Sequence, residues 1–283
     1  MVDPGSAPSQ PGDGDIATPS ASQRAFDTGV AHPARIYDYW LGGKDNYAAD
    51  RAAAEQAIAV DPNVLIGVRA NRAFLRRAVT YLAREAGVRQ FLDIGTGLPT
   101  AGNTHEVAQG VAADCRVVYV DNDPIVLAHA HALLTGTAEG VTDYIEADVR
   151  DTTKILTEVA ERLDLGQPVA VNALAILQYI PDSDGPHRIV AQLMDAMPSG
   201  SYLTISEMTR DIVTDLVSTV ASKLNAKMGD TSMTLRTREE FTHYFDGLDL
   251  VDPGVVPLVA WRSEDGAPDG AGIPLYAGMA RKP

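Results

Sequence analysis

The sequence of 283 residues contains a single cysteine and no long apolar run. With Cys115 alone, no disulfide can form within the chain, and a lone cysteine is typical of a reducing compartment. A membrane-spanning helix needs about 20 consecutive apolar residues, and the sequence has no such run. The first residues also lack the apolar core of a secretory signal peptide. We therefore expect a cytoplasmic protein that does not bind a membrane.

Basic side chains are scarce as well. The chain carries 23 Lys and Arg residues against 38 Asp and Glu residues, which gives a net charge of -15. A field of this sign repels phosphate backbones, so nucleic acid is not an expected partner. The densest basic group, Arg69, Arg72, Arg76 and Arg77, has the spacing of a solvated helix face.

The chain divides by composition into three parts. Residues 1–24 are rich in Pro, Gly, Ser and Asp, so we expect a disordered tail. Residues 25–88 are expected to form a helical cap or lid, because apolar residues recur at helical spacing over 63–86. Within this part, residues 32–47 mix aromatic, glycine and charged residues, a combination typical of loops that line a site. Residues 89–283 are long enough for one sizeable domain.

Strand patterns alternate with helix patterns from residue 91 onward. This alternation predicts a parallel, doubly wound α/β sheet. The last two strand patterns have no helix between them, so we expect a terminal antiparallel hairpin and seven strands in all. The expected strands are 91–94, 117–120, 144–147, 168–174, 201–206, 255–261 and 274–280, and the expected helices are 100–111, 123–134, 151–163, 184–197, 210–227 and 237–245.

A glycine turn and three acids mark the expected ligand site. The turn Gly95-Thr96-Gly97 follows the first strand, which carries Asp93, and the next two strands end at Asp121 and Asp148. In open α/β sheets, ligands bind at the carboxyl ends of the strands, and an acid after the second strand takes ribose hydroxyls. The pattern predicts an adenosine-containing cofactor.

Two cofactors fit such a sheet. An NAD site uses Gly-x-Gly-x-x-Gly or Ala, whereas this chain has Thr100 at the third position and Pro99 before it. An acid at Asp93 suits a ligand with a cationic amino-acid portion, such as S-adenosylmethionine. The residues favour S-adenosylmethionine and leave NAD as the alternative.

The motifs FLDIGTG, VVYVDNDP, YIEADVRD and VAVNALAILQYIPD, in this order, resemble those of class I S-adenosylmethionine-dependent methyltransferases. The segment HPARIYDYWLGGKDNY together with DIGTGLPT resembles an actinobacterial methyltransferase family whose acceptor is unassigned. The resemblance implies a Rossmann-like fold and S-adenosylhomocysteine as product. It also implies cofactor contacts from the strand ends: Asp93, Gly95, Thr96 and Gly97 at the methionine end, Asp121 with Asn122 at the ribose, and Asp148 with Val149 at the adenine. Asn172 and Ala173, near the end of the fourth strand, are added to this set, although many relatives carry an acid where Asn172 stands.

Methyl transfer needs a general base only if the acceptor must lose a proton. Lone His and Tyr residues are more often structural than catalytic, and the pair His129 and His131 offers no further ligands at metal spacing, so we expect no metal. The candidate bases are His32, Tyr37, Asp45, His105, Tyr179 and Glu207.

Three functions remain open from the sequence. The leading hypothesis is methyl transfer from S-adenosylmethionine to a small molecule. A nicotinamide-dependent oxidoreductase and a non-catalytic protein that binds S-adenosylmethionine are the alternatives. The acceptor, the methylated atom, the pathway and the oligomeric state are not indicated by the sequence.

Overall fold

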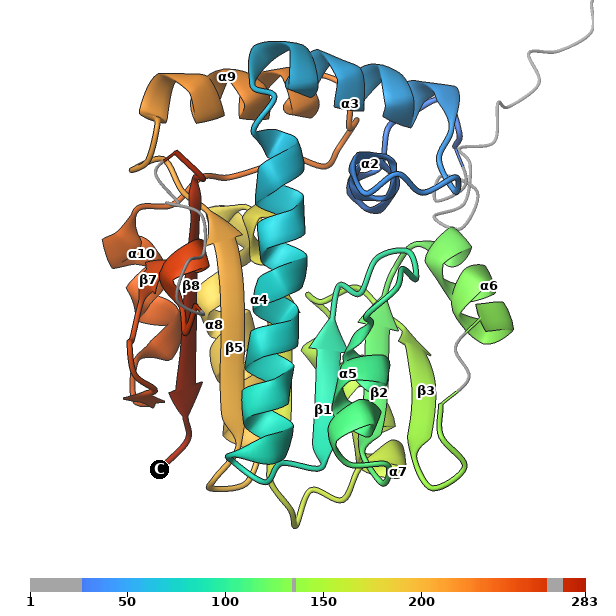
Figure 1. Cartoon of the computed structure of the whole chain (residues 1–283), viewed down its shortest axis with the longest axis vertical. Helices are drawn as coiled ribbons and strands as arrows, with labels where there is room; N and C mark the ends of the chain where they lie inside the picture. Colours follow the sequence, from blue (N-terminus) through green and yellow to red (C-terminus); the bar gives the residue numbers. More distant parts are fainter. Residues whose placement is uncertain (1–26, 134–135, 264–271) are drawn as a thin grey trace, which may run out of the picture.

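A computed structural model describes residues 27–133, 136–263 and 272–283. The expected tail at 1–24 and most of the turn expected before the last strand lie outside the described residues. The chain builds a central sheet with helices on both faces and a further helical layer across one end of the sheet (Figure 1).

The sheet is mostly parallel, as the sequence predicts. Its order is β3-β2-β1-β4-β5-β8-β6, with β7 also pairing with β8. The first five strands are parallel, and β8 is antiparallel to its neighbours. Strands covered on both faces are apolar throughout, and β1 is buried along its whole length. The strands are β1 Gln90–Ile94, β2 Arg116–Asp121, β3 Val141–Glu146, β4 Val169–Leu174, β5 Tyr202–Met208, β6 Asp249–Leu250, β7 Val256–Pro257 and β8 Leu275–Arg281.

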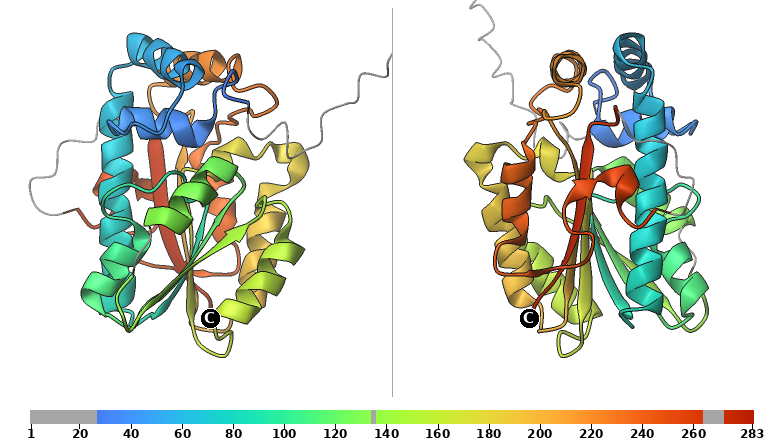
Figure 2. Two further views of the ribbon diagram at one scale, coloured as in Figure 1. Left: turned by 90° about the vertical axis from the view of Figure 1, so that its right-hand side faces the viewer. Right: turned by 60° about the vertical axis from the view of Figure 1, so that its left-hand side comes forward.

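Helices cover the two faces of the sheet and create two apolar cores (Figure 2). On one face, α4 (Val64–Arg84), α5 (Thr104–Val111) and α6 (Pro124–Leu133) pack over the aromatic side of β1, β2 and β3. On the other face lie α7 (Thr152–Arg162), α8 (Pro186–Ala196) and α10 (Arg238–Thr242). The order of the strands in the sheet reverses between β1 and β4, and at such a point a crevice opens between the carboxyl ends of the two strands.

A third layer lies across the carboxyl ends of the strands. It contains α2 (Pro33–Trp40), α3 (Ala48–Val60) and α9 (Thr214–Asn225), together with the N-terminal end of α4 (Figure 1). These elements share a separate apolar cluster. The helical layer therefore combines the N-terminal segment with α9, which follows β5, and only the first part of α4 belongs to it.

The C-terminal part departs most from the expected elements. The strand expected at 255–261 is only two residues long, because Leu258–Ala260 forms a 3-10 turn that buries Trp261 edge-on against Phe74 of α4, with ring centroids 5.3 Å apart. The short β6 was not expected. It lies beside the same edge of β8 as β7, so the sheet keeps seven positions although eight strands are assigned.

Two helices begin later than the sequence predicts. The helix expected from residue 100 begins at Thr104, where the Asn103 side chain and Glu106 form a reciprocal cap. Such a pair satisfies backbone N–H groups of the first turn. The helix expected from residue 210 begins at Thr214, because Val213 before it adopts a left-handed backbone conformation with φ 47°.

Candidate active site

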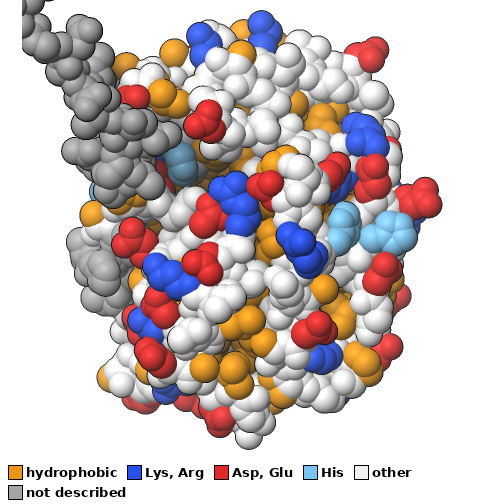
Figure 3. Space-filling view, turned by 180° about the vertical axis from the view of Figure 1, so that it is seen from behind, with side chains coloured by type: hydrophobic (Ala, Val, Ile, Leu, Met, Phe, Trp, Pro, Cys, Tyr) orange, Lys and Arg blue, Asp and Glu red, His pale blue; other side chains and the backbone are white. Residues whose placement is uncertain are grey.

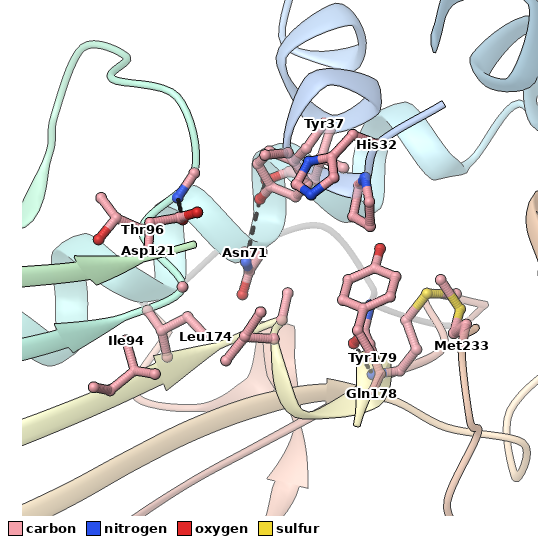
Figure 4. A pocket seen from close by; sticks show the side chains of 18 of the residues that line it. His32, Tyr37, Asn71, Ile94, Thr96, Asp121, Leu174, Gln178, Tyr179 and Met233 are labelled. Carbon is pink, nitrogen blue, oxygen red and sulfur yellow. Dashed lines mark hydrogen bonds between the residues drawn. The ribbon is translucent and has the colours of Figure 1, made fainter. Parts of the chain in front are cut away.

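A cavity of about 420 Å³ lies between the carboxyl ends of the strands and the helical layer (Figure 4). This volume lies within the range of sites for cofactors and small molecules. Its walls come from the ends of β1 to β4, from α2, α4 and α9, and from the loop 230–233. One continuous cavity thus joins the strand ends to the helical layer.

The glycine turn after β1 forms one wall of the cavity. Gly95 and Gly97 have φ values of 68° and 67°, a region that side chains with a Cβ disfavour. A Cβ on Gly95 would lie 2.4 Å from Ile176 Cγ1, whereas a Cβ on Gly97 would meet only Ala34, at 3.9 Å. Gly95 therefore permits close packing of the loop after β4, and Gly97 leaves its backbone open to a ligand.

Asp93 lies at the floor of the cavity and is 6% exposed. Thr104 donates its hydroxyl to Asp93 Oδ2 at 2.5 Å. Burial raises the pKa of Asp93 to about 6, although the Thr104 hydrogen bond and Arg72 oppose the rise. A buried carboxylate without an ion-pair partner is costly, so this site favours a cationic group from a ligand.

Asp121, at the end of β2, braces the glycine turn. Its Oδ2 accepts the Gly97 N–H at 2.9 Å, and its Oδ1 accepts the Asp123 N–H at 2.9 Å. Burial raises the pKa of Asp121, and the two backbone N–H groups and His32 oppose the rise. Each carboxylate oxygen keeps a further lone pair, so Asp121 can still accept hydrogen bonds from a ligand.

Asp148 is held by two other residues of the cavity wall, Arg150 and Asn122. Burial acts to raise its pKa, but hydrogen bonds from Arg150 bring the pKa below its ordinary value. The two side chains form an ion pair at 2.6 Å, and Asn122 donates its Nδ2 to Asp148 Oδ2 at 3.2 Å. Asn122, Asp148 and Val149 all line the cavity.

Three candidate bases line the cavity, namely His32, Tyr37 and Tyr179. His32 Nδ1 lies 3.1 Å from Asp123 Oδ2, and burial lowers its pKa below 6.5 although Asp123 opposes this. Burial raises the pKa of Tyr37 and takes that of Tyr179 to about 12. Near pH 7 both tyrosines therefore keep their protons, and His32 alone among the three has a free lone pair on a basic nitrogen that can accept one.

The other three candidate bases do not line the cavity. Glu207 is 1% exposed on the opposite face of the sheet and pairs with the buried Arg236 at 2.5 Å. His105 is buried against the Tyr119 hydroxyl, with 2.8 Å between Nδ1 and the hydroxyl oxygen. Asp45 lies 3.7 Å from His129 Nδ1, outside the cavity wall. Their contacts give them structural roles, which removes the ground for a catalytic one.

Asn172 and Ala173 also lie outside the cavity wall. Asn172 is 1% exposed within β4, between Asp93 of β1 and Thr204 of β5 in the sheet register. Its amide finds no hydrogen-bond partner among the described residues. The wall after β4 is formed instead by Leu174, Ala175 and Ile176.

Arg72 is a cavity residue that the sequence interpretation missed. Expected on a solvated helix face, it lines the cavity and donates Nη2 to the carbonyl oxygen of Gly102 at 2.8 Å. Arg77, from the same group, donates to the carbonyl oxygens of Trp261 and Leu258. Counting helical turns back from Phe74 and Leu75, which are buried, could have placed Arg72 and Asn71 near the sheet.

The segment 32–47 folds as α2 and a tight loop. Asp38 accepts the N–H of Asp45 at 3.0 Å and Nδ2 of Asn46 at 2.8 Å. A Cβ on Gly43 would lie 1.9 Å from Asp38 Oδ1, so the loop requires glycine there. Much of this motif therefore shapes the helical layer, while His32 and Tyr37 reach the cavity.

Comparison with known proteins identifies the family. The sequence profile described as S-adenosyl methyltransferase matches residues 19–283. The chain belongs to this family. Its cofactor is therefore S-adenosylmethionine, and the chain is a methyltransferase, as the motifs predicted. The family supports a methyltransferase over the two alternatives, a nicotinamide-dependent oxidoreductase and a non-catalytic binding protein.

Two solved structures are similar over nearly the whole chain. A DUF574 family protein from Streptomyces avermitilis is 46% identical, with a TM-score of 0.87, and the match covers 91% of this chain and 99% of that one. A proposed methyltransferase from Thermobifida fusca is 38% identical, with a TM-score of 0.83, over 94% and 99% of the two chains. Both sources are actinobacteria, in agreement with the sequence interpretation. Among curated proteins, none matches the chain.

More distant structures share the fold alone. The plantazolicin methyltransferase BpumL is 13% identical, with a TM-score of 0.52, and the match covers 88% of this chain and 96% of that one. This similarity supports a class I, Rossmann-like methyltransferase fold.

The cavity wall suits the family's cofactor. Gly97 exposes its backbone to the cavity, and Asp93 and Asp121 offer buried carboxylate oxygens. Over the described residues, no cluster of three or more His, Cys, Asp or Glu could hold a metal ion. Within the same ranges, no helix is long and apolar enough to cross a membrane.

Proposed function

We propose that this methyltransferase acts on a small molecule that binds in the same cavity as the methyl donor. The observation that carries the proposal is the continuity of the cavity from the strand ends to the helical layer. A space of about 420 Å³ suits a small acceptor beside the donor. On the face shown in Figure 3, basic groups lie scattered among acidic ones, a distribution that does not favour nucleic acid.

We assign the adenosine part of the cofactor to the ends of β2 and β3. Asp121 would accept the ribose hydroxyls with the lone pairs that its bonds to Gly97 and Asp123 leave unused. Asn122 would flank the ribose and Val149 the adenine, and Asp148, fixed by Arg150, would accept from the adenine amino group. The Gly97 turn leaves room for the ligand to approach the backbone.

We assign the methionine part to Asp93 and Arg72. Asp93 would pair with the ammonium group, because among the described residues its buried carboxylate accepts from the neutral Thr104 hydroxyl and forms no ion pair. Arg72 lines the same end of the cavity. Its Nη2 donates to Ala101, Gly102 and Asn103, and its Nε and Nη1 groups can donate to a ligand. A guanidinium matches a carboxylate geometrically, so Arg72 would bind the methionine carboxylate.

When bound, S-adenosylmethionine supplies an electrophilic methyl group, and the protein has to orient the acceptor and exclude water. We assign to His32 the role of the general base that takes the proton from the acceptor. Its lowered pKa keeps the imidazole neutral, and Asp123 would stabilise the imidazolium formed. This arrangement is that of a general base with a supporting carboxylate.

The ribose assignment predicts a specific interaction between Asp121 and the sugar. Asp121→Ala should weaken S-adenosylhomocysteine binding by about tenfold or more, since hydrogen bonds to charged groups contribute about 1.5–3 kcal/mol. Calorimetric titrations would compare S-adenosylhomocysteine with its 2′-deoxy analogue on both proteins. In the variant the two ligands should bind almost equally. Equal weakening of both ligands, with their ratio preserved, would show only a loosened glycine turn and contradict the assignment.

The protonation state of His32 can be measured without an acceptor. An NMR titration of the imidazole signals, assigned with His32→Gln, should give a midpoint for His32 below 6.5, because burial disfavours the charged ring. A midpoint at or above 6.5 would contradict the effect of burial on His32, and a midpoint above 7 would exclude it as a base that is neutral at pH 7.

A further inference from the structure

The half of the cavity beneath the helical layer is apolar. Its wall contains side chains from the apolar cluster shared by α2, α3, α4 and α9. Several of them are fully or almost fully buried, although they reach the cavity. The apolar wall residues are Trp40, Val68, Val220, Leu224 and Met233.

Cationic side chains are confined to the other half. Of the described residues in the cavity wall, the Lys and Arg residues are Arg72 and Arg150. Both belong to the cofactor end, where Arg150 pairs with Asp148 and Asp184. Three acids line this part of the wall. Asp38 and Asp61 are buried and already accept hydrogen bonds within the protein, and Asp230, on the loop that carries Met233, is exposed. A carboxylate or phosphate on the acceptor would find no cation in this half of the wall, and an uncharged molecule would need none.

A directed chain of hydrogen bonds reaches the apolar half through Tyr37. The carbonyl oxygen of Val68 can only accept, so the Tyr37 hydroxyl donates to it, at 3.1 Å. Asn71 must then donate Nδ2 to the Tyr37 oxygen, at 3.1 Å, and its Oδ1 accepts from the Ser206 hydroxyl at 2.6 Å. The proton of Tyr37 is therefore already used, and its oxygen offers a ligand one remaining lone pair.

Tyr179 presents the complementary group. Figure 4 shows its hydroxyl pointing toward the side of the cavity that carries Tyr37 and His32. The neighbouring Gln178 Oε1 already accepts the Met208 N–H, at 3.1 Å, so the Tyr179 hydroxyl can direct its proton to a ligand in the cavity. Tyr179 therefore keeps its own proton to donate. The cavity offers one acceptor and one donor, which is the complement of a hydroxyl group.

We propose that the methyl acceptor is an uncharged, largely apolar molecule whose hydroxyl group donates to Tyr37 and accepts from Tyr179. This inference rests on the proposed function, because it requires donor and acceptor in one cavity. The hydroxyl oxygen has a second lone pair left for the methyl carbon. The new bond is O–CH3, the bond broken is S–CH3, and its electron pair stays on sulfur. As the O–CH3 bond forms, the hydroxyl proton leaves its hydrogen bond with Tyr37 and passes to the neutral imidazole of His32, which lines the same cavity. The product is a methyl ether.

The test uses matched aromatic probes that differ in one substituent. For single-ring and fused-ring scaffolds, calorimetry would compare the phenol, the unsubstituted ring and the carboxylate, for example 2-naphthol, naphthalene and 2-naphthoate, with the protein saturated with S-adenosylhomocysteine. The phenols should bind about tenfold more tightly than the unsubstituted rings, as two hydrogen bonds of about 0.5–1.5 kcal/mol each imply. The carboxylates should bind more weakly than the phenols.

The variant Tyr37→Phe should remove much of the phenol's advantage and leave the affinity for S-adenosylhomocysteine and for the unsubstituted rings unchanged. Should this variant melt far below the wild type, Tyr179→Phe replaces it, because it removes the donor of the pair and leaves the hydrogen bonds of Tyr37 to Val68 and Asn71 intact. Carboxylates that bind as tightly as the phenols, phenols that do not bind, or an unchanged phenol advantage in the variant would each overturn the proposal. Absence of S-adenosylhomocysteine binding in the first titration would instead contradict the assigned cofactor site.

Discussion

Replacing Asp93 by asparagine should stabilise the cofactor-free protein above pH 6 and weaken its affinity for S-adenosylmethionine about 10- to 100-fold. Burial raises the pKa of Asp93 from 3.8 to about 6, so ionisation of this side chain destabilises the folded state. At 1.36 kcal/mol per pH unit, this rise corresponds to about 3 kcal/mol. The asparagine can still accept the Thr104 hydroxyl, but it cannot pair with an ammonium group, and hydrogen bonds to charged groups contribute about 1.5–3 kcal/mol.

The pH dependence follows from the direction of the pKa shift. Because the pKa of Asp93 is higher in the folded state, its favourable contribution is complete below pH 3.8 and disappears as the pH rises through about 6. The melting temperatures of Asp93→Asn and wild type should therefore coincide near pH 4 and diverge up to pH 6. Above pH 6 the variant should melt about 5 °C higher or more.

Thermal melts across this pH range, with Asp195→Asn as an exposed acid-to-amide control, measure the effect. The control should follow the wild type at every pH. A variant that melts below the wild type at pH 8, or that binds S-adenosylmethionine with unchanged affinity, would contradict the role given to Asp93.

Gly95→Ala should destabilise the protein by about 3 kcal/mol or more and abolish measurable cofactor binding. A left-handed conformation costs a residue with a Cβ about 1–2 kcal/mol. The added Cβ would also lie 2.4 Å from Ile176 Cγ1 and 2.8 Å from Ile176 Cβ, and overpacking of this kind costs about 1–3 kcal/mol more. Relief would require movement of the glycine turn or of the loop after β4, both of which line the cavity.

The chain offers a matched control for this substitution. Gly87 has a φ of 69°, close to the 68° of Gly95, but a Cβ there would meet nothing within 4 Å. Gly87→Ala should thus lose only the conformational part of the stability and bind S-adenosylhomocysteine normally. The double variant Gly95→Ala, Ile176→Ala should recover the part of the loss that comes from the collision. Equal melting temperatures for Gly95→Ala and Gly87→Ala would show that the contact with Ile176 contributes nothing.

Local signals in the sequence were sufficient for the parallel sheet. Buried strands are apolar along their length, and the strand patterns are therefore visible in the sequence. The glycine turn comes directly after one of these strands, and Asp93 and Asp121 lie at or near strand ends. The sequence alone therefore places both acids at one edge of the sheet. The helix expected over 151–163 is also present, and the Asp151 side chain caps it by accepting the Lys154 N–H.

Contacts between distant segments could not be predicted in this way. Glu207 is the second-last residue of β5 and an acid like Asp121, but its side chain points to the opposite face, where the distant Arg236 pairs with it. Side chains alternate between the two faces of a strand, so a shift of one residue decides the face. His105, on α5, faces the Tyr119 hydroxyl rather than the cavity. Arg72 was misplaced because the spacing of a basic group on a helix does not indicate which neighbours cover it.

The helix α4 has a consequence for how the molecule unfolds. It is an uninterrupted helix of 21 residues, which spans about 30 Å at 1.5 Å per residue. One end carries Val68 in the helical layer, and the other carries Phe74, Val79 and Leu82 in the core over the sheet. A helix that contributes side chains to two cores couples their unfolding, because the loss of the helix from one core also removes its apolar contacts from the other. We therefore expect the helical layer and the sheet to unfold as one unit, and a ligand bound beneath the layer to slow hydrogen exchange in the strands farthest from it.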